Sequence, residues 1–179
     1  MAWEYDENKL AELMLYVADK LRDDRAGGAT KLNKVLFFAE FAHMRRYGQP
    51  ITGAEYQKLE WGPAPRRLVP VRDGLVDSGK ALIEERFFLG YLQHRLVPNE
   101  PVRPQLLSPQ EIESTNEVVE DLRGLTARQV SDLSHAEEGW RMVADGETIP
   151  YEAAVLRRPV VTERVRKRGA ELAEQHSRS

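Results

Sequence analysis

The chain contains no cysteine, which excludes disulfides, thiolate nucleophiles and thiolate metal sites. Long apolar runs are also missing. The longest one, from Val35 to Ala39, is far shorter than the roughly 20 residues that a membrane-spanning helix needs. The first residues are acidic where a signal peptide would be basic, so we expect no secretion by that route. These three absences together predict a cytoplasmic protein that is not associated with a membrane.

The composition is that of a globular domain with an acidic body. The 179 residues are 41% hydrophobic and 31% charged, which excludes wholesale disorder and low complexity. Residues 157–179 hold seven Lys or Arg residues against three Asp or Glu residues, a net charge of +4. Residues 1–156 hold 19 against 26, a net charge of −7. Such a body repels a phosphate backbone, so a nucleic-acid partner is not favoured, and only the basic tail keeps that alternative open.

The N-terminal part predicts two helices of different character. Asp6 is the expected N-cap of the first, whose apolar residues recur at helical spacing along one face as far as Leu21. Thr30 is expected to cap the second, which runs to about Tyr47 and is apolar nearly all round. A helix of that kind is central and buried. Gly48 then stands where a left-handed C-cap residue is preferred.

The middle of the chain predicts a β element and one further helix. Residues 56–61 are rich in aromatics that alternate with charges, which favours a strand. Residues 81–97 predict a hairpin that turns near Gly90 and joins the first strand in one small antiparallel sheet. Between them lies a helix that Gly79 closes. Pro70 conflicts with its interior, so this helix either starts later or is bent.

The C-terminal half predicts short, well-capped helices. Ser108 precedes Pro109 and a Glu at the third position, which combines a capping box with proline at the first helical residue. Thr126 opens a second capping box, and Ser134 a third. Another short helix is expected to begin at about Tyr151. The fold class is therefore mostly α (α+β), a compact helical domain with a small antiparallel β element.

Histidines and tryptophans are the residues that first suggest chemistry. His43, near the end of the buried helix, is interpreted as a core histidine rather than a catalytic one. The Ser134-His135 pair is explained by helix capping. No ligand pair or phosphate-binding loop is present in the sequence, so neither a metal nor another cofactor is expected. Trp61 and Trp140 are interpreted as core residues. Arg66 and Arg67 near Trp61 leave a partner-binding spot open, because Trp and Arg are enriched at interface hot spots.

An ordered series of short motifs resembles the Panacea domain, the SocA-like antitoxin family, over roughly residues 8 to 156. The N-terminal block is Lys31-Leu32-Asn33-Lys34-Val35-Leu36-Phe37-Phe38-Ala39-Glu40-Phe41, His43, Tyr47-Gly48, Pro50-Ile51-Thr52-Gly53, Tyr56 and Trp61-Gly62-Pro63. The later block is Leu107-Ser108, Glu111, Leu125-Thr126, Leu133-Ser134-His135, Trp140 and Ile149-Pro150-Tyr151-Glu152. Ala64 departs from the larger aliphatic residue that the family often has after Gly-Pro.

The resemblance implies a non-enzymatic antitoxin that binds and silences a protein toxin encoded beside it, including in phage defence. It also leaves open an adaptor that delivers the toxin to a protease. The motif residues are expected to form a structural cluster in which His43, Tyr56, His135 and Trp140 lie against one another. The full set is His43, Tyr56, Gly62, Pro63, His135, Trp140 and Tyr151.

Two further alternatives stay open at this point. One is a hydrolase that uses His43 and His135, which would require the two rings to converge in an open cleft. The other is nucleic-acid binding through the basic tail. The expected domain organisation is a Panacea-like antitoxin domain over residues 1–156 followed by a basic, helical or partly disordered tail over residues 157–179. The sequence does not name the toxin, the surface that binds it or the oligomeric state.

Overall fold

The structure is a computed structural model that describes residues 3–156, so the predicted basic tail lies outside the described residues. The fold is mostly helical with a small antiparallel β component, as predicted. In chain order the elements are α1 (Glu7–Lys20), α2 (Ala29–Tyr47), β1 (Tyr56–Gln57), β2 (Ala64–Pro65), α3 (Leu68–Asp77), β3 (Ala81–Phe88), β4 (Tyr91–Pro98), α4 (Pro109–Asp121), α5 (Ala127–His135), α6 (Glu138–Met142), β5 (Thr148–Ile149) and the 3-10 helix η1 (Tyr151–Leu156).

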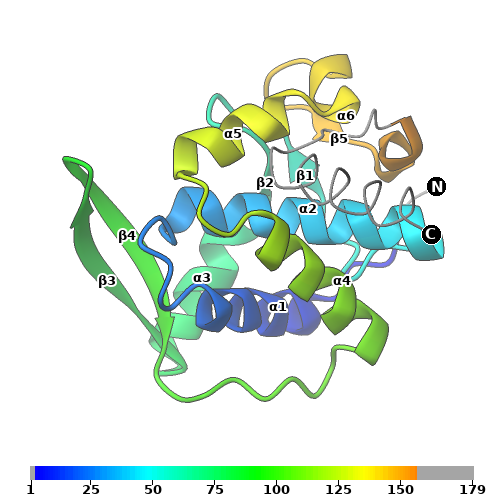
Figure 1. Cartoon of the computed structure of the whole chain (residues 1–179). Coiled ribbons are helices and arrows are strands. Elements are labelled where there is room, and N and C mark those ends of the chain that lie inside the picture. The colour runs from blue at the N-terminus through cyan, green and yellow to red at the C-terminus, as the bar shows by residue number, and fades with distance from the viewer. Residues whose placement is uncertain (1–2, 157–179) are drawn as a thin grey trace, which may run out of the picture.

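Helix α2 is the centre of the molecule, as its nearly uniform apolar character predicts. It contacts α1, α4, α5, β2, β4 and η1, and Figure 1 shows it running through the middle with α1 and α4 on one side and α5 and α6 on the other. Its residues from Val35 to Phe41 are all buried. Gly48 closes the helix in the left-handed conformation, at φ 74°. The expected cap at Thr30 is wrong by two positions, because the helix begins at Ala29 with Gly28 as its N-cap.

Most of the predicted caps are confirmed. The Asp6 carboxylate accepts a hydrogen bond from the Lys9 backbone N–H at the start of α1. Ser108 and Thr126 form complete capping boxes at α4 and α5. The third predicted capping box is wrong. Ser134 lies inside α5, and its hydroxyl donates to the Ser131 carbonyl instead of capping the start of a helix. Helix α6 starts later, with no side-chain cap.

Pro70 is the third residue of α3, which resolves the conflict in the sequence. The first turn of a helix has no intrahelical acceptors for its N–H groups, so a proline there removes no hydrogen bond. The helix therefore needs no bend at this residue.

The β structure forms two separate sheets, so the single predicted sheet is wrong. The hairpin β3–β4 is confirmed, with its turn at Leu89 and Gly90. The other sheet has the order β2-β1-β5, and β1 is shorter than the predicted strand over residues 56–61. Its third strand, β5, comes from the far end of the described chain, which no local pattern predicts. Residues 58–63 instead form a loop between β1 and β2.

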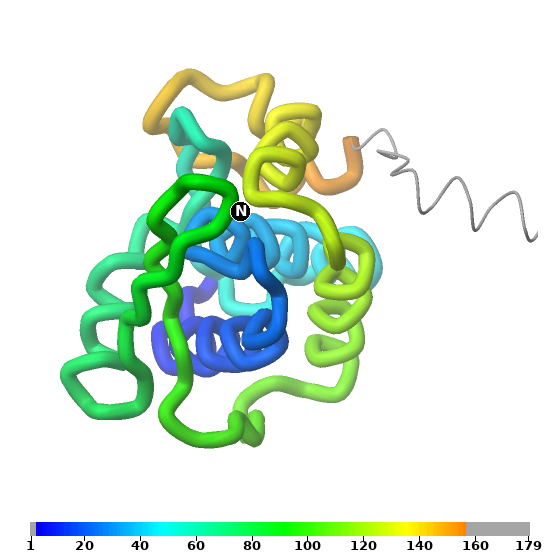
Figure 2. Tube along the Cα trace, turned by 60° about the vertical axis from the view of Figure 1, so that its left-hand side comes forward, coloured from blue at the N-terminus to red at the C-terminus, as the bar shows by residue number. Residues whose placement is uncertain are grey.

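The hairpin β3–β4 extends along one side of the helical body (Figures 1 and 2). Its base is fastened by Arg95, whose buried guanidinium donates hydrogen bonds to the carbonyls of Leu21 and Asp24. These carbonyls follow the C-terminal end of α1, where the helix dipole favours a cation. No helix of residues 3–156 is long and apolar enough to cross a membrane.

Candidate functional site

The candidate site is the Trp61 loop, residues 59–63, which connects β1 to β2. A backbone hydrogen bond from Gly62 N–H to the Leu59 carbonyl closes the turn. The Trp61 carbonyl accepts from the Ser131 hydroxyl on α5 at 3.0 Å, and the Pro63 carbonyl accepts from the Lys34 ammonium on α2 at 3.0 Å. Side chains from two helices thus hold the loop at the carbonyls on either side of Gly62.

Gly62 is required at the centre of this loop by both conformation and space. Its φ of 101° lies in a region that side chains strongly disfavour. A Cβ there would lie 2.4 Å from Lys34 Cε and 2.4 Å from Ser134 Oγ. The glycine therefore lets the loop backbone pass directly over the buried lysine.

Lys34 is buried and sets the electrostatics of the site. Burial lowers the pKa of its ammonium from 10.5 to about 8. Partial burial of the His135 imidazole, together with the positive charge of Lys34, lowers the pKa of His135, which favours the neutral ring. A neutral ring stacks readily, and His135 lies on the Trp140 indole with ring centroids 4.3 Å apart. On this indole lies the Lys58 ammonium, 4.1 Å from the ring centroid.

Trp61 itself is 70% exposed, so its interpretation as a core residue is wrong. The loop buries Gly62 and Pro63 and leaves the large indole in solvent. Trp140 is half-buried and packs against the core, in keeping with its predicted place. The two tryptophans thus have opposite environments although both follow turn or cap residues in the sequence.

Arg66 and Arg67 are exposed beyond the same loop, and the chain's own acceptors already bind their guanidinium groups. Arg66 donates to the Thr148 hydroxyl and the Gly146 carbonyl, which ties β2 to the segment around β5. Arg67 donates to the Glu7 carboxylate at 2.8 Å, an exposed ion pair. These contacts support the sheet and the start of α1.

The predicted cluster of motif residues divides into separate groups along α2, so the prediction that His43 lies against His135 and Trp140 is wrong. His43 shares a 3.0 Å hydrogen bond with the Ser114 hydroxyl of α4 and packs on Tyr47. Because nine residues separate it from Lys34 on one helix, it lies about 13 Å further along the axis. Tyr56 and Tyr151 form a third group with Phe41 between them.

The separation of His43 from His135 bears on the hydrolase alternative. His43 is buried, and its burial lowers the pKa of the imidazole. It does not converge with His135 on a common cleft, which the hydrolase alternative requires. Among the described residues, no group of three or more potential ligands is placed to hold a metal ion.

Sequence reasoning missed the buried charges of α2. Lys31, Lys34 and Glu40 are all buried, within a helix that was described only by its apolar residues. Lys31 pairs with Asp24 at 2.7 Å and donates to the Leu125 carbonyl. The sequence does contain a signal for these buried charges. A helix that is apolar nearly all round is buried on every side, so the charged residues in its middle are buried with it.

Glu40 organises the loop that follows α2. Its carboxylate accepts hydrogen bonds from the backbone N–H groups of Ile51 and Thr52 and from the Thr52 hydroxyl. Burial raises the pKa of this carboxyl to about 7 against the opposing effect of those donors. The Thr52 carbonyl in turn accepts from Asp6 N–H, so this loop connects α2 to the start of α1.

The family model described as antitoxin SocA-like, Panacea domain, matches residues 32–141. The chain belongs to this family. The matched region begins in α2, ends in α6 and includes the Trp61 loop, Lys34 and His135, so the candidate site lies within the Panacea domain. No curated protein and no solved structure matches the chain.

The first testable prediction concerns Gly62. We expect Gly62→Ala to lower the free energy of unfolding by about 2–5 kcal/mol, because it adds backbone strain and a clash with Lys34 and Ser134. Urea denaturation measures the change. Gly74→Ala is the matched control: this glycine lies inside α3 with open space around it, so the alanine should stabilise by about 0.5–1 kcal/mol. Equal effects of the two substitutions would contradict the assignment.

A second prediction follows from the lowered pKa of Lys34. Between pH 8 and 10.5 the unfolded chain binds more protons at this amine than the folded protein does, so stability rises with pH across that window. The expected gain is about 1–3 kcal/mol. Urea denaturation at several pH values should show this gain as a difference between the wild type and Lys34→Met, in which it is absent. Parallel profiles for the two proteins would refute the lowered pKa.

Proposed function

We propose that this Panacea domain is an antitoxin that neutralises a co-encoded protein toxin by binding it directly. Membership of the SocA-like antitoxin family is the observation that carries the proposal. The separation of His43 from His135 supports a binding role over hydrolysis, since the two rings lie in different groups along α2. The toxin is the implied partner, and a cytoplasmic site of action follows if the toxin acts there.

The Trp61 loop supplies a suitable anchor for such a partner. An exposed indole on a loop held by Lys34 and Ser131 loses little conformational entropy when it is covered. Tryptophan is also among the residues most enriched at interface hot spots, and those residues tend to lie near the centre of an interface. A stable interface buries about 1,200–2,000 Å² in total, so the contact extends from Trp61 over the exposed arginines, Arg66 and Arg67.

The third prediction tests both the function and this anchor. We expect co-expression of the chain to rescue cells from the product of the neighbouring open reading frame, and the purified proteins to form a complex. Trp61→Ala should weaken that complex by about tenfold or more and leave the melting temperature nearly unchanged, because the indole is exposed. Leu106→Ala is the control, since Leu106 is also exposed but lies in the connector that binds Glu12 of α1.

The outcomes of this experiment separate the candidate mechanisms. Rescue together with a stable complex supports neutralisation by binding. Rescue that depends on a host protease, with falling toxin levels, identifies a proteolytic adaptor instead. No rescue of any neighbouring toxic gene, combined with a hydrolase activity that His135→Ala removes, would overturn the antitoxin proposal.

We further propose that the domain ends close to Leu156 and that residues 157–179 form a separate basic segment. The charge contrast supports this, with +4 in the segment and −7 in residues 1–156. The fourth prediction is that deletion of residues 160–179 leaves the melting temperature within a few degrees of the wild type. Partner affinity, measured at two salt concentrations, reports whether the segment attracts the toxin, because such attraction weakens as salt rises. A loss of several kcal/mol in stability would show that the boundary is wrong.

A further inference from the structure

The hairpin β3–β4 has one edge against the body and one edge free. Strand β4 contacts α1 and α2, and Gln93 on it packs against Gly28 at the start of α2. Strand β3 lies on the outer side, where its contacts with a helix are those with α3 (Figure 1). No strand within residues 3–156 pairs with the outer edge of β3.

The turn of the hairpin shows which backbone groups face that free edge. Leu89 and Gly90 both have positive φ, at 50° and 80°, which is the pattern of a two-residue type I′ turn. Such a turn closes on a hydrogen-bonded pair, here Phe88 with Tyr91. Hydrogen-bonded and non-hydrogen-bonded pairs alternate along antiparallel strands. The N–H and C=O groups of Ile83, Glu85 and Phe87 therefore point away from β4, toward the outer edge.

This edge lacks several of the devices that usually block strand addition. The eight residues of β3 contain no proline and no lysine, and the register with β4 runs without a bulge from Ala81 to Phe88, although three charged residues, Glu84, Glu85 and Arg86, occupy the middle of the strand. The hairpin end is also rich in exposed apolar side chains, with Phe87 81% exposed and Tyr91 77% exposed. An exposed edge of this kind is a template for pairing with another chain.

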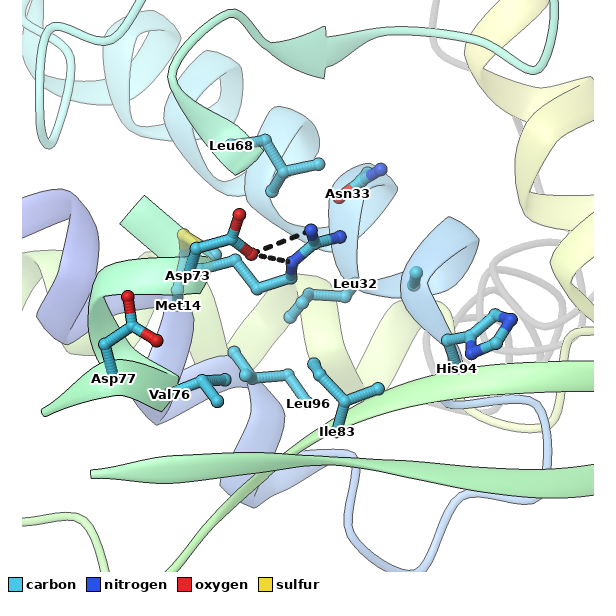
Figure 3. Close-up of a pocket in the computed structure, with 12 residues that line it drawn as sticks. Met14, Leu32, Asn33, Leu68, Asp73, Val76, Asp77, Ile83, His94 and Leu96 are labelled. Carbon is cyan, nitrogen blue, oxygen red and sulfur yellow. Dashed lines mark hydrogen bonds and ion pairs between the residues drawn. The ribbon is translucent and has the colours of Figure 1, made fainter. Parts of the chain in front are cut away.

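An apolar groove of about 440 Å³ lies between the hairpin and α3 (Figure 3). Ile83 and Leu96 line it from the hairpin, and Leu68 and Val76 line it from α3. Ile83 lies on the same face of β3 as Phe87, because side chains alternate along a strand. The side chains of a strand added to β3 would therefore lie along this face, with the groove beneath them.

The polar groups of the groove favour a basic occupant. Asp73 and Asp77 lie along α3, and the guanidinium of Arg72 donates to Asp73 at 2.8 Å (Figure 3). Asp77 has no ion-pair partner in the described chain, so an acidic group is left for a cation from outside. Asn33 also lines the groove, and its buried Oδ1 accepts no hydrogen bond from residues 3–156. The body as a whole, with a net charge of −7 over residues 1–156, adds to this attraction.

We propose that the outer edge of β3 binds an extended segment of the partner toxin, which adds as a third strand of the sheet. That segment has apolar side chains for Ile83 and Phe87, a polar or basic side chain for Glu85, which lies between them on the same face, and a Lys or Arg that reaches Asp77. Backbone hydrogen bonds supply affinity and the groove supplies specificity, as in other strand-addition complexes. This inference rests on the proposed antitoxin function and names a second contact surface for it.

Both surfaces border the same part of α2. Asn33 lines the groove while the next residue, Lys34, holds the Trp61 loop. A toxin that covers Trp61 therefore needs to extend only past the N-terminal half of α2 to reach the hairpin. The Trp61 loop and the outer edge of β3 can therefore be tested by separate substitutions.

The fifth prediction uses residue-resolved hydrogen exchange, with the protein product of the neighbouring open reading frame as the probe. In the free protein the amides of Ile83, Glu85 and Phe87 should exchange fast, while the ladder amides of Glu84 and Arg86 exchange slowly. In the complex, exchange at the three outward amides should slow by about tenfold or more. Unchanged exchange at these amides in a complex that does form would overturn strand addition and leave the antitoxin function standing.

A matched pair of variants at Glu85 isolates the backbone contribution. Glu85→Pro and Glu85→Ala both remove the carboxylate and its 3.6 Å contact with His94, but only the proline removes the outward N–H. A proline is tolerated at an edge position whose N–H faces solvent, so the hairpin should persist. We expect Glu85→Pro to weaken the complex by about tenfold and Glu85→Ala by less than about threefold.

Circular dichroism and melting temperature show whether Glu85→Pro still folds, and the exchange experiment on the wild type needs no variant at all. Equal affinities of the two Glu85 variants would overturn the inference. Protection of the outward amides in the free protein, together with a dimer in sedimentation, would also overturn it, because the occupant would then be a second copy of this chain. If the wild type binds no neighbouring gene product, the proposed function fails and this inference fails with it.

Discussion

A buried charge must be hydrogen-bonded, and this constraint at α2 organises much of the fold. The helix places Lys31, Lys34 and Glu40 out of solvent, where an unpaired ion is strongly unfavourable. Each of the three is satisfied by backbone groups of a loop that is distant in sequence or follows the helix. The central helix therefore fixes the positions of loops through these hydrogen bonds, in addition to packing against other helices.

The consequences differ from one charge to the next. Lys31 joins the loop after α1 to the turn before α5, and Glu40 joins the loop after α2 to the start of α1. Lys34 holds the Trp61 loop, and its lowered pKa shows that this ammonium is held at some expense in stability. A loop fixed in this way presents the exposed Trp61 in a defined position, which is what a binding surface requires. The physical link between stability and proposed function therefore passes through Lys34.

Arg95 has a similar role at the base of the hairpin. Its guanidinium binds carbonyls of the C-cap residue of α1 and of the loop that follows, so β4 is held against the body while β3 stays free. An isolated two-stranded hairpin is only marginally stable in water, and this anchorage explains how a long one persists here. The same anchorage determines which edge is available to a partner.

Local patterns were sufficient for the elements that depend on neighbouring residues. The Ser108 and Thr126 capping boxes, the left-handed Gly48 and the hairpin turn at Gly90 each follow from interactions within a few residues. Ser134 shows the limit of such reasoning. The same capping-box pattern occurs here inside α5, where the Ser134 hydroxyl bonds to the carbonyl of Ser131 in the same helix. Trp61 shows it too, since an aromatic beside a turn has no local signal for exposure.

The amino-acid sequence is enough to predict a mostly helical domain with a buried central helix, and its ordered motifs point to the family. The grouping of the motif residues along α2, the pairing of β5 with β1 and the exposure of Trp61 follow only from the folded chain. Helix caps, turns and apolar periodicity are local, whereas the partners of Lys34, His43 and Arg95 come from segments that only folding brings together.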